Sequence, residues 1–308
     1  MTTLGDVGLE LAAPAPAAPS TLARVLHNPS VLAGGAVLLA MLAIALLAPL
    51  LGTIDPARID PAARNQRPGS EITQRADNGA QLTRTAWMGT DSLGRDVYSR
   101  VIYGTRVSLA VGVAATLVSV AIGLSLGLFA GYVRWLDAVV MRVMDGVMAI
   151  PGVLLAITLV ALWGAGLSTV VLAIAVPEIP RVVRLVRSLV LTIREEPYVE
   201  AAVALGTRLP LILLRHVMPN TIAPLIVQAT FICANAVLLE ALLSFLGIGI
   251  PPEIPTWGNV MAEGRAQFND YPHNIFFPGL FLAVTVLAVN ILGDGLRDTL
   301  DPKMAKRV

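Results

Sequence analysis

The chain has 308 residues, of which 56% are hydrophobic and only 14% are charged, and its formal net charge is +1. Soluble domains carry about 25% charged residues, so the composition excludes a soluble globular protein and predicts a membrane protein. The net charge identifies no partner, and we expect no nucleic-acid binding. The single cysteine, Cys233, excludes an intrachain disulfide and a cysteine-based metal site.

The N-terminal residues 1–30 are rich in Ala and Pro and are predicted to be a disordered tail. Asp6 and Glu10 stand where a cleavable signal would carry basic residues, which predicts that the first apolar run is an uncleaved span. This first span covers 31–51, and a long loop follows it at 52–106.

Four charge-free apolar runs, and a fifth that contains only Glu240, are long enough to cross a bilayer. The run at 146–177 would extend about 48 Å as one helix, beyond a hydrocarbon core of about 30 Å. Gly164, Gly166 and Ser168 are therefore predicted to break it into two spans. The chain is predicted to be an all-α, polytopic membrane protein with about six transmembrane helices, at 31–51, 107–132, 138–163, 168–190, 222–247 and 275–296.

The distribution of arginine predicts the orientation, because loops rich in Arg and Lys face the cytoplasm. Six arginines crowd the segment between the fourth and fifth spans, namely Arg181, Arg184, Arg187, Arg194, Arg208 and Arg215. Both termini, including a tail at 299–308, are then cytoplasmic, and residues 52–106 form an external loop. The basic residues of that loop are interleaved with acidic ones, and long segments are exported largely regardless of charge.

The second span contains three glycines, Gly123, Gly127 and Gly131, at a spacing of four residues. This spacing places them on one helix face, where missing side chains allow another helix to approach closely. We interpret the pattern as a packing surface; a hinge is the alternative.

The segment at 194–220, REEPYVEAAVALGTRLPLILLRHVMPN, is too polar to span a membrane and is predicted to form two short helices. Pro197 suits a first helical turn, and neighbouring glutamates favour the positive end of the helix dipole. Gly206 ends the first helix, and Thr207 is predicted to cap a second one that ends before Pro219.

Several residues of this segment resemble the EAA signature of binding-protein-dependent ABC importer permeases, namely Glu200-Ala201-Ala202, Gly206, His216 and Pro219-Asn220. Two other stretches are similar to the dipeptide and oligopeptide permeases of the DppC/OppC type. They are GTDSLGRDVYSR from Gly89 with YGTRVSL from Tyr103, and EALLSFLGIG from Glu240 with PTWG from Pro255. The resemblance runs from about Leu22 to Pro302, with a permease core at 107–298.

The resemblance implies a type I ABC importer transmembrane domain with cytoplasmic coupling helices at 196–218. The residues that it places at the ATPase, or in the same coupling element, are Glu200, Ala201, Ala202, Gly206, His216 and Pro219. It also implies a second, DppB/OppB-like permease, two ATP-binding subunits and an external solute-binding protein, in the lipid of a bacterial inner membrane. The expected activity is uptake of di- or oligopeptides, or related small solutes, by alternating access.

The fourth span departs from that family's usual pattern of an aromatic residue, a small residue and Arg. It has Pro177-Glu178-Ile179-Pro180-Arg181 there, and two prolines so close together are predicted to kink or end the helix.

A nucleotide site is not predicted on this chain. A P-loop requires a lysine directly after glycine, whereas Lys303 and Lys306 are the only lysines and neither follows glycine. We expect ATP and Mg²⁺ to bind the partner subunits, and we expect no catalytic residue, metal site or cofactor on this chain.

Three polar residues inside the fifth span are candidate functional groups. Glu240 is either the proton site of a secondary transporter, which is the alternative function, or a hydrogen-bonded group with a structural or gating role. Gln228 and Asn235 share a helix face and either line a polar pathway or bond to a neighbouring helix.

The arginine triplet of the fourth span, Arg181, Arg184 and Arg187, has the spacing of a voltage-sensor helix. The other interpretation is that these side chains extend to the cytoplasmic interface at the end of the span.

Overall fold

The computed structural model describes residues 21–75 and 81–300, so most of both predicted tails lies outside the described residues. Its helices are α1 (Thr21–His27), α2 (Pro29–Leu47), α3 (Val97–Tyr132), α4 (Arg134–Met148), α5 (Gly152–Trp163), α6 (Leu167–Ile193), α7 (Pro197–Ala204), α8 (Leu209–Ile212), α9 (Met218–Phe245), α10 (Trp257–Gly264) and α11 (His273–Leu300). Two strands, β1 (Ser70–Arg75) and β2 (Gln81–Ala86), form an antiparallel hairpin.

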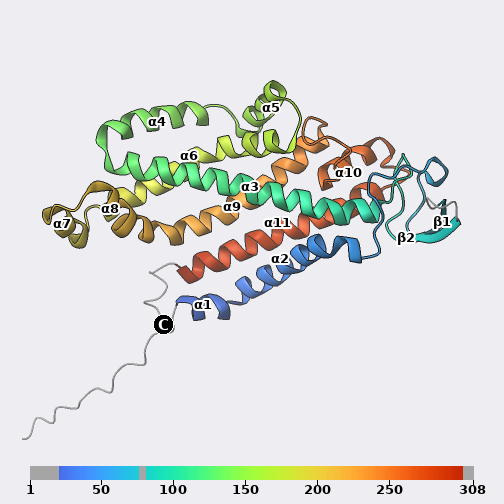
Figure 1. Cartoon of the computed structure of the whole chain (residues 1–308), viewed down its shortest axis with the longest axis horizontal. Coiled ribbons are helices and arrows are strands. Elements are labelled where there is room, and N and C mark those ends of the chain that lie inside the picture. Colours follow the sequence, from blue (N-terminus) through green and yellow to red (C-terminus); the bar gives the residue numbers. More distant parts are fainter. Residues whose placement is uncertain (1–20, 76–80, 301–308) are drawn as a thin grey trace, which may run out of the picture.

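The long helices lie side by side in an elongated bundle (Figure 1). The short helices α7 and α8 lie at one end, and the hairpin and α10 lie at the other. Helix α2 packs against α11, and α3 packs against both α6 and α9. The residues of α7 and α8 are therefore separated from those of the hairpin and α10 by the length of the bundle.

Four helical stretches in the described chain are long and apolar enough to cross a membrane, and a fifth is possible if a bent pair counts as one. The four are Pro29–Leu50, Val97–Tyr132, Leu209–Phe245 and His273–Leu300. The predicted fourth span corresponds to α6, which is 27 residues long but carries a glutamate and three arginines. The all-α, multi-span expectation is confirmed.

The predicted third span, 138–163, is not one helix. It consists of α4 and α5, which are bent by 88° relative to each other. Pro151 lies at the break and disfavours helical backbone at the residue before it, Ile150. The prediction was wrong because it treated the apolar run as continuous and gave this proline no weight.

The two prolines of α6, unlike Pro151, lie inside a continuous helix. Helix α6 continues through Pro177 and Pro180, so of the two predicted outcomes, a kink or an end of the helix, the end is excluded. The prolines remove the donors that would bond the carbonyls of Ala173 and Val176. Packing of α6 between neighbouring helices maintains its helical path despite this loss.

The glycine spacing of α3 does create a close packing surface, as predicted. Each glycine faces one valine of α6: Gly123, Gly127 and Gly131 face Val182, Val186 and Val190. A Cβ atom added to these glycines would lie only 2.4, 2.7 and 2.6 Å from the valine Cβ atoms. The two helices therefore approach so closely that only glycine fits.

Helix α3 begins ten residues before the predicted span at 107, and the preceding segment ends at residue 96. Asp96 caps the helix by accepting a 2.8 Å hydrogen bond from the backbone N–H of Ser99. The sequence prediction started too late because Arg100 and Arg106 interrupt the apolar pattern. Arg100 is nevertheless fully buried in the structure.

Candidate functional site

Helix α7 ends at Gly206 in a left-handed turn with φ of +75°. The backbone N–H of Gly206 donates to the carbonyl of Val203, and that of Thr207 donates to the carbonyl of Ala202, at 2.9 and 3.1 Å. This pair of bonds is the Schellman motif, which satisfies the last carbonyls of a helix and favours glycine. Gly206 therefore stops α7 as predicted.

The element after the turn differs from the prediction. Helix α8 begins at Leu209, its N-cap is Arg208, and Thr207 does not cap it. Pro219 does not end the second helix, because Leu209–Phe245 forms one continuous 37-residue stretch with a π-helical turn at Leu213–Val217. Pro219 is the second residue of α9 and follows directly after this π-helical turn.

Both alanines of α7 were expected to meet the ATPase, but only one of them is exposed. Glu200 and Ala201 are exposed, whereas Ala202 is only 7% exposed and packs towards the chain's own interior. Leu205, the residue directly after α7, is 86% exposed. Its signal in the sequence is an apolar side chain directly before the helix-ending glycine, although Leu205 was not among the predicted coupling residues.

A small polar and aromatic cluster joins α7 to the start of α9. The rings of Tyr198 and His216 lie 6.5 Å apart between centroids. The side-chain amide of Asn220 donates to the Tyr198 hydroxyl at 3.1 Å and to the His216 carbonyl at 2.7 Å. Tyr198, His216 and Asn220 therefore hold α7 against the long helix.

An apolar cluster continues this attachment into the bundle. Val199 of α7 and Ile212 of α8 belong to the same buried cluster as Val186 and Val190 of α6. The two short helices are thus part of the core rather than an independent appendage.

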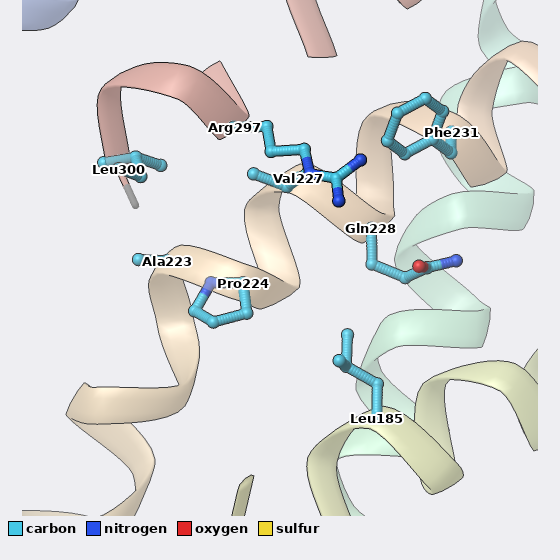
Figure 2. Close-up of a pocket in the computed structure, with 8 residues that line it drawn as sticks. All are labelled: Leu185, Ala223, Pro224, Val227, Gln228, Phe231, Arg297 and Leu300. Carbon is cyan, nitrogen blue, oxygen red and sulfur yellow. The ribbon is translucent and has the colours of Figure 1, made fainter. Parts of the chain in front are cut away.

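Gln228 lines a cavity of about 480 Å³ between α6, α9 and α11 (Figure 2). The wall is mostly apolar, with Gln228 and Arg297 as its polar members. Figure 2 shows the Arg297 side chain extending from α11 towards α9, above Gln228.

Asn235 lies at a different cavity, so the structure does not bring the two predicted pathway residues together. This second cavity has a volume of about 250 Å³ and lies beside the break between α4 and α5. The Asn235 side-chain amide donates to Glu178 Oε1 at 2.6 Å, and Glu178 also accepts from Arg181. Glu178 was not among the predicted site residues, although it is the one carboxyl group in the predicted fourth span.

Glu240 is fully buried and accepts two hydrogen bonds. Ser108 Oγ of α3 donates to Oε2 at 3.0 Å, and Ser244 Oγ donates to Oε1 at 2.8 Å. Glu240 lines neither of the two cavities. Its environment fits the structural interpretation, in which it ties α9 to α3.

The remaining two arginines of the predicted triplet form ion pairs with α4. Arg184 lies 2.6 Å from Asp145, and Arg187 Nη2 lies 2.7 Å from Asp137. These pairs connect α6 to α4, and the geometry gives no support to a voltage-sensor helix.

A buried ion-pair network occupies the opposite end of the bundle. Arg95 pairs with Asp91 at 2.7 Å and with Glu263 of α10, and Arg100 Nη2 lies 3.3 Å from Glu263. Burial raises the pKa of Glu263, an effect that the nearby Arg100 and Arg95 oppose. The network joins the GTDSLGRD stretch to α10, a connection that the sequence could not reveal.

Comparison with known proteins identifies the family. The family model described as binding-protein-dependent transport system inner membrane component matches residues 101–306, and that of the N-terminal TM domain of oligopeptide transport permease C matches 20–68. The chain is 50% identical over 91% of its length to the probable peptide ABC transporter permease protein y4tQ of Sinorhizobium fredii, covering 91% of that protein. It is 40% identical over 90% of its length to the dipeptide transport system permease protein DppC of Alkalihalophilus pseudofirmus, covering 87% of it.

A third relative is the glutathione transport system permease protein GsiD of Pectobacterium atrosepticum, with 45% identity over 71% of this chain and 73% of that protein. The fold is similar to a structure of the MetNI methionine ABC transporter in an inward-facing conformation, with a TM-score of 0.53, 18% identity and coverage of 65% of this chain and 95% of that one. The chain is therefore a member of the binding-protein-dependent transport system inner membrane component family, a multi-pass inner-membrane permease subunit of an ABC importer.

Proposed function

We propose that α7 and α8 are the coupling helices through which ATP-binding subunits move this permease. The observation that carries the proposal is the exposed α7 surface, formed by Glu200, Ala201 and Leu205, on a helix fixed to the bundle. An exposed leucine directly beside a small residue and a carboxylate suits a partner pocket with an apolar floor and a basic rim.

The partners follow from the family. A binding-protein-dependent importer requires a second permease, ATP-binding subunits and an external binding protein, and we propose two ATP-binding subunits that hold ATP and Mg²⁺. Hydrolysis then belongs to the partners, and this chain converts their closure into alternating access. The two states differ in their affinity for partners and solute, and that difference shifts the populations.

The proposed orientation places α7 and both termini in the cytoplasm. The hairpin and α10 lie at the other end of the bundle (Figure 1) and then face the binding protein, together with the ion-pair network that includes Glu263 of α10. The arginines at the end of α6 and in the short segment before α9 (Arg187, Arg194, Arg208 and Arg215) support this orientation, because long segments such as 52–96 are exported largely regardless of charge.

The proposed solutes are di- or oligopeptides or related small peptides. The support is the naming of relatives as peptide, dipeptide and glutathione permeases. ATP-driven uptake of labelled dipeptide into proteoliposomes that hold the complete complex and its binding protein tests this assignment. Uptake driven by a proton gradient without ATP would refute it.

Cysteine crosslinking tests the coupling surface. Cys233 is the sole cysteine and is first replaced by alanine. Ala201→Cys is expected to crosslink to an ATP-binding subunit, whereas Ala202→Cys, at the buried neighbouring position, is the matched control and is expected not to. Crosslinking from neither Ala201→Cys nor Leu205→Cys would refute the docking assignment.

A further inference from the structure

Arg181 lies at the middle of α6, where a charged side chain is costly in a membrane protein. It is twelve residues from the helix end at Ile193, which is about 18 Å at 1.5 Å per residue. Charged groups at such positions face a cavity or a partner and by default indicate function. Arg181 has both: it lines the smaller cavity and it pairs with Glu178.

The pairing uses only one end of the guanidinium group. Nη1 of Arg181 donates to both carboxylate oxygens of Glu178 at 2.9 Å. Asn235 adds a 2.6 Å bond to Oε1 of Glu178 and so fixes the carboxylate. Among the residues that the structure describes, Nε and Nη2 of Arg181 have no hydrogen-bond partner.

The two side chains of the ion pair differ in their exposure to solvent. The side chain of Glu178 is 4% exposed, whereas that of Arg181 is 55% exposed. The Glu178 carboxylate already accepts three hydrogen bonds and exposes little surface to a cation that enters the cavity. An anion can reach the guanidinium, whose free Nε and Nη2 have the fork geometry that matches a carboxylate.

The rest of the cavity wall is apolar. It includes Met148, Pro151 and Val153 around the break between α4 and α5, and Leu239 of α9. Its volume of about 250 Å³ is below the range of about 300–1,000 Å³ that is typical of complete ligand pockets. It therefore accommodates one end of a solute, a carboxyl group with an adjacent apolar side chain.

We propose that Arg181 binds the terminal carboxylate of the transported solute during its passage through the permease. The proposal rests on the proposed peptide transport and names the part of the solute that this chain contacts. Glu178 neutralises the guanidinium when the cavity holds no solute, so the site does not retain a carboxylate as strongly as an unpaired arginine would.

The test measures binding of two probes, alanyl-alanine and alanyl-alaninamide, to the detergent-solubilised complete complex without its binding protein. Ligand-observed NMR titration gives the affinity for each probe. Wild type is expected to bind the free acid at least about tenfold more tightly than the amide, the effect of one charge-assisted pair. Equal affinities in wild type would overturn the proposal.

Two variants break the same ion pair and separate the proposed site from a merely structural one. Arg181→Gln removes the cation and is expected to abolish the preference for the free acid. Glu178→Gln keeps the cation and is expected to retain the preference. Loss of the preference in both variants, or in neither, would overturn the proposal.

The uptake assay is independent of this measurement. Absence of ATP-driven dipeptide uptake with the probe preference intact would refute the proposed function but not the carboxylate site. Normal uptake without any probe preference would refute the site alone.

Discussion

The packing between α3 and α6 can be tested by a single methyl group at Gly127. A Cβ atom there would lie 2.7 Å from Val186 Cβ and 3.0 Å from the carbonyl oxygen of Val183. Ordinary carbon contacts are about 3.5–4.0 Å, so Gly127→Ala requires the helices to separate by about 1 Å. Overpacking of this kind costs about 1–3 kcal/mol.

The matched control is Gly146 in α4, where an added Cβ meets no atom within 4 Å. Both substitutions gain up to about 1 kcal/mol of helix propensity, so their difference isolates the packing term. Thermal unfolding of the purified complex is expected to show Gly127→Ala less stable than wild type and Gly146→Ala at least as stable. If Gly127→Ala proved as stable as Gly146→Ala, the close-packing argument would be wrong.

Three further predictions concern other parts of the chain. Gly206→Ala places a Cβ at φ of +75°, which costs about 1–2 kcal/mol, so the purified complex should retain ATP hydrolysis but lose part of its uptake per ATP. Glu240→Gln keeps one oxygen acceptor for a serine hydroxyl and offers an amide N–H to the other, so it should leave ATP-driven uptake within about threefold of wild type; complete loss of uptake would contradict the structural role. Burial raises the pKa of Glu263, so the folded protein favours the protonated carboxyl group. The stability that this preference provides is fully present below the usual carboxyl pKa and is lost as pH rises through the raised pKa. The stability of wild type relative to Glu263→Gln, from thermal unfolding, should therefore fall as pH increases; a constant or increasing difference would contradict the burial argument.

Apolar run length was sufficient to predict the class of fold, because hydrocarbon thickness fixes how long a span must be. The packing face of α3 was also predictable, since Gly127 and its neighbours at a spacing of four can only serve one helix surface. The end of α7 at Gly206 was predictable because the Schellman turn is a local interaction.

Features that depend on tertiary contacts could not be predicted. Arg100 interrupts an apolar pattern and resembles a loop residue, yet it is buried because Glu263, 163 residues away in the chain, neutralises it. The partnership between Glu178 and Asn235 likewise joins two helices. Pro151 and Pro180 show that local chemistry is also insufficient, since one lies at a helix break and the other lies inside a continuous helix.

The contacts determine which helices can move together when α7 is displaced. The continuous stretch Leu209–Phe245 is about 55 Å long at 1.5 Å per residue and connects α8 to the second cavity. Glu240 ties this stretch to α3, and the glycine face ties α3 to α6. Helices α3, α6 and α9 therefore form one unit, into which Ala156 and Val160 of α5 also pack. Helix α4, on the other side of the break at Pro151, buries only Met144. Because the Arg181 cavity lies between that unit and the break, we infer that a force on α7 changes the width of this cavity. Spin labels on α4 and α9 should report different distances with and without ATP, whereas labels on α3 and α6 should not; a change between α3 and α6 would disprove the single unit.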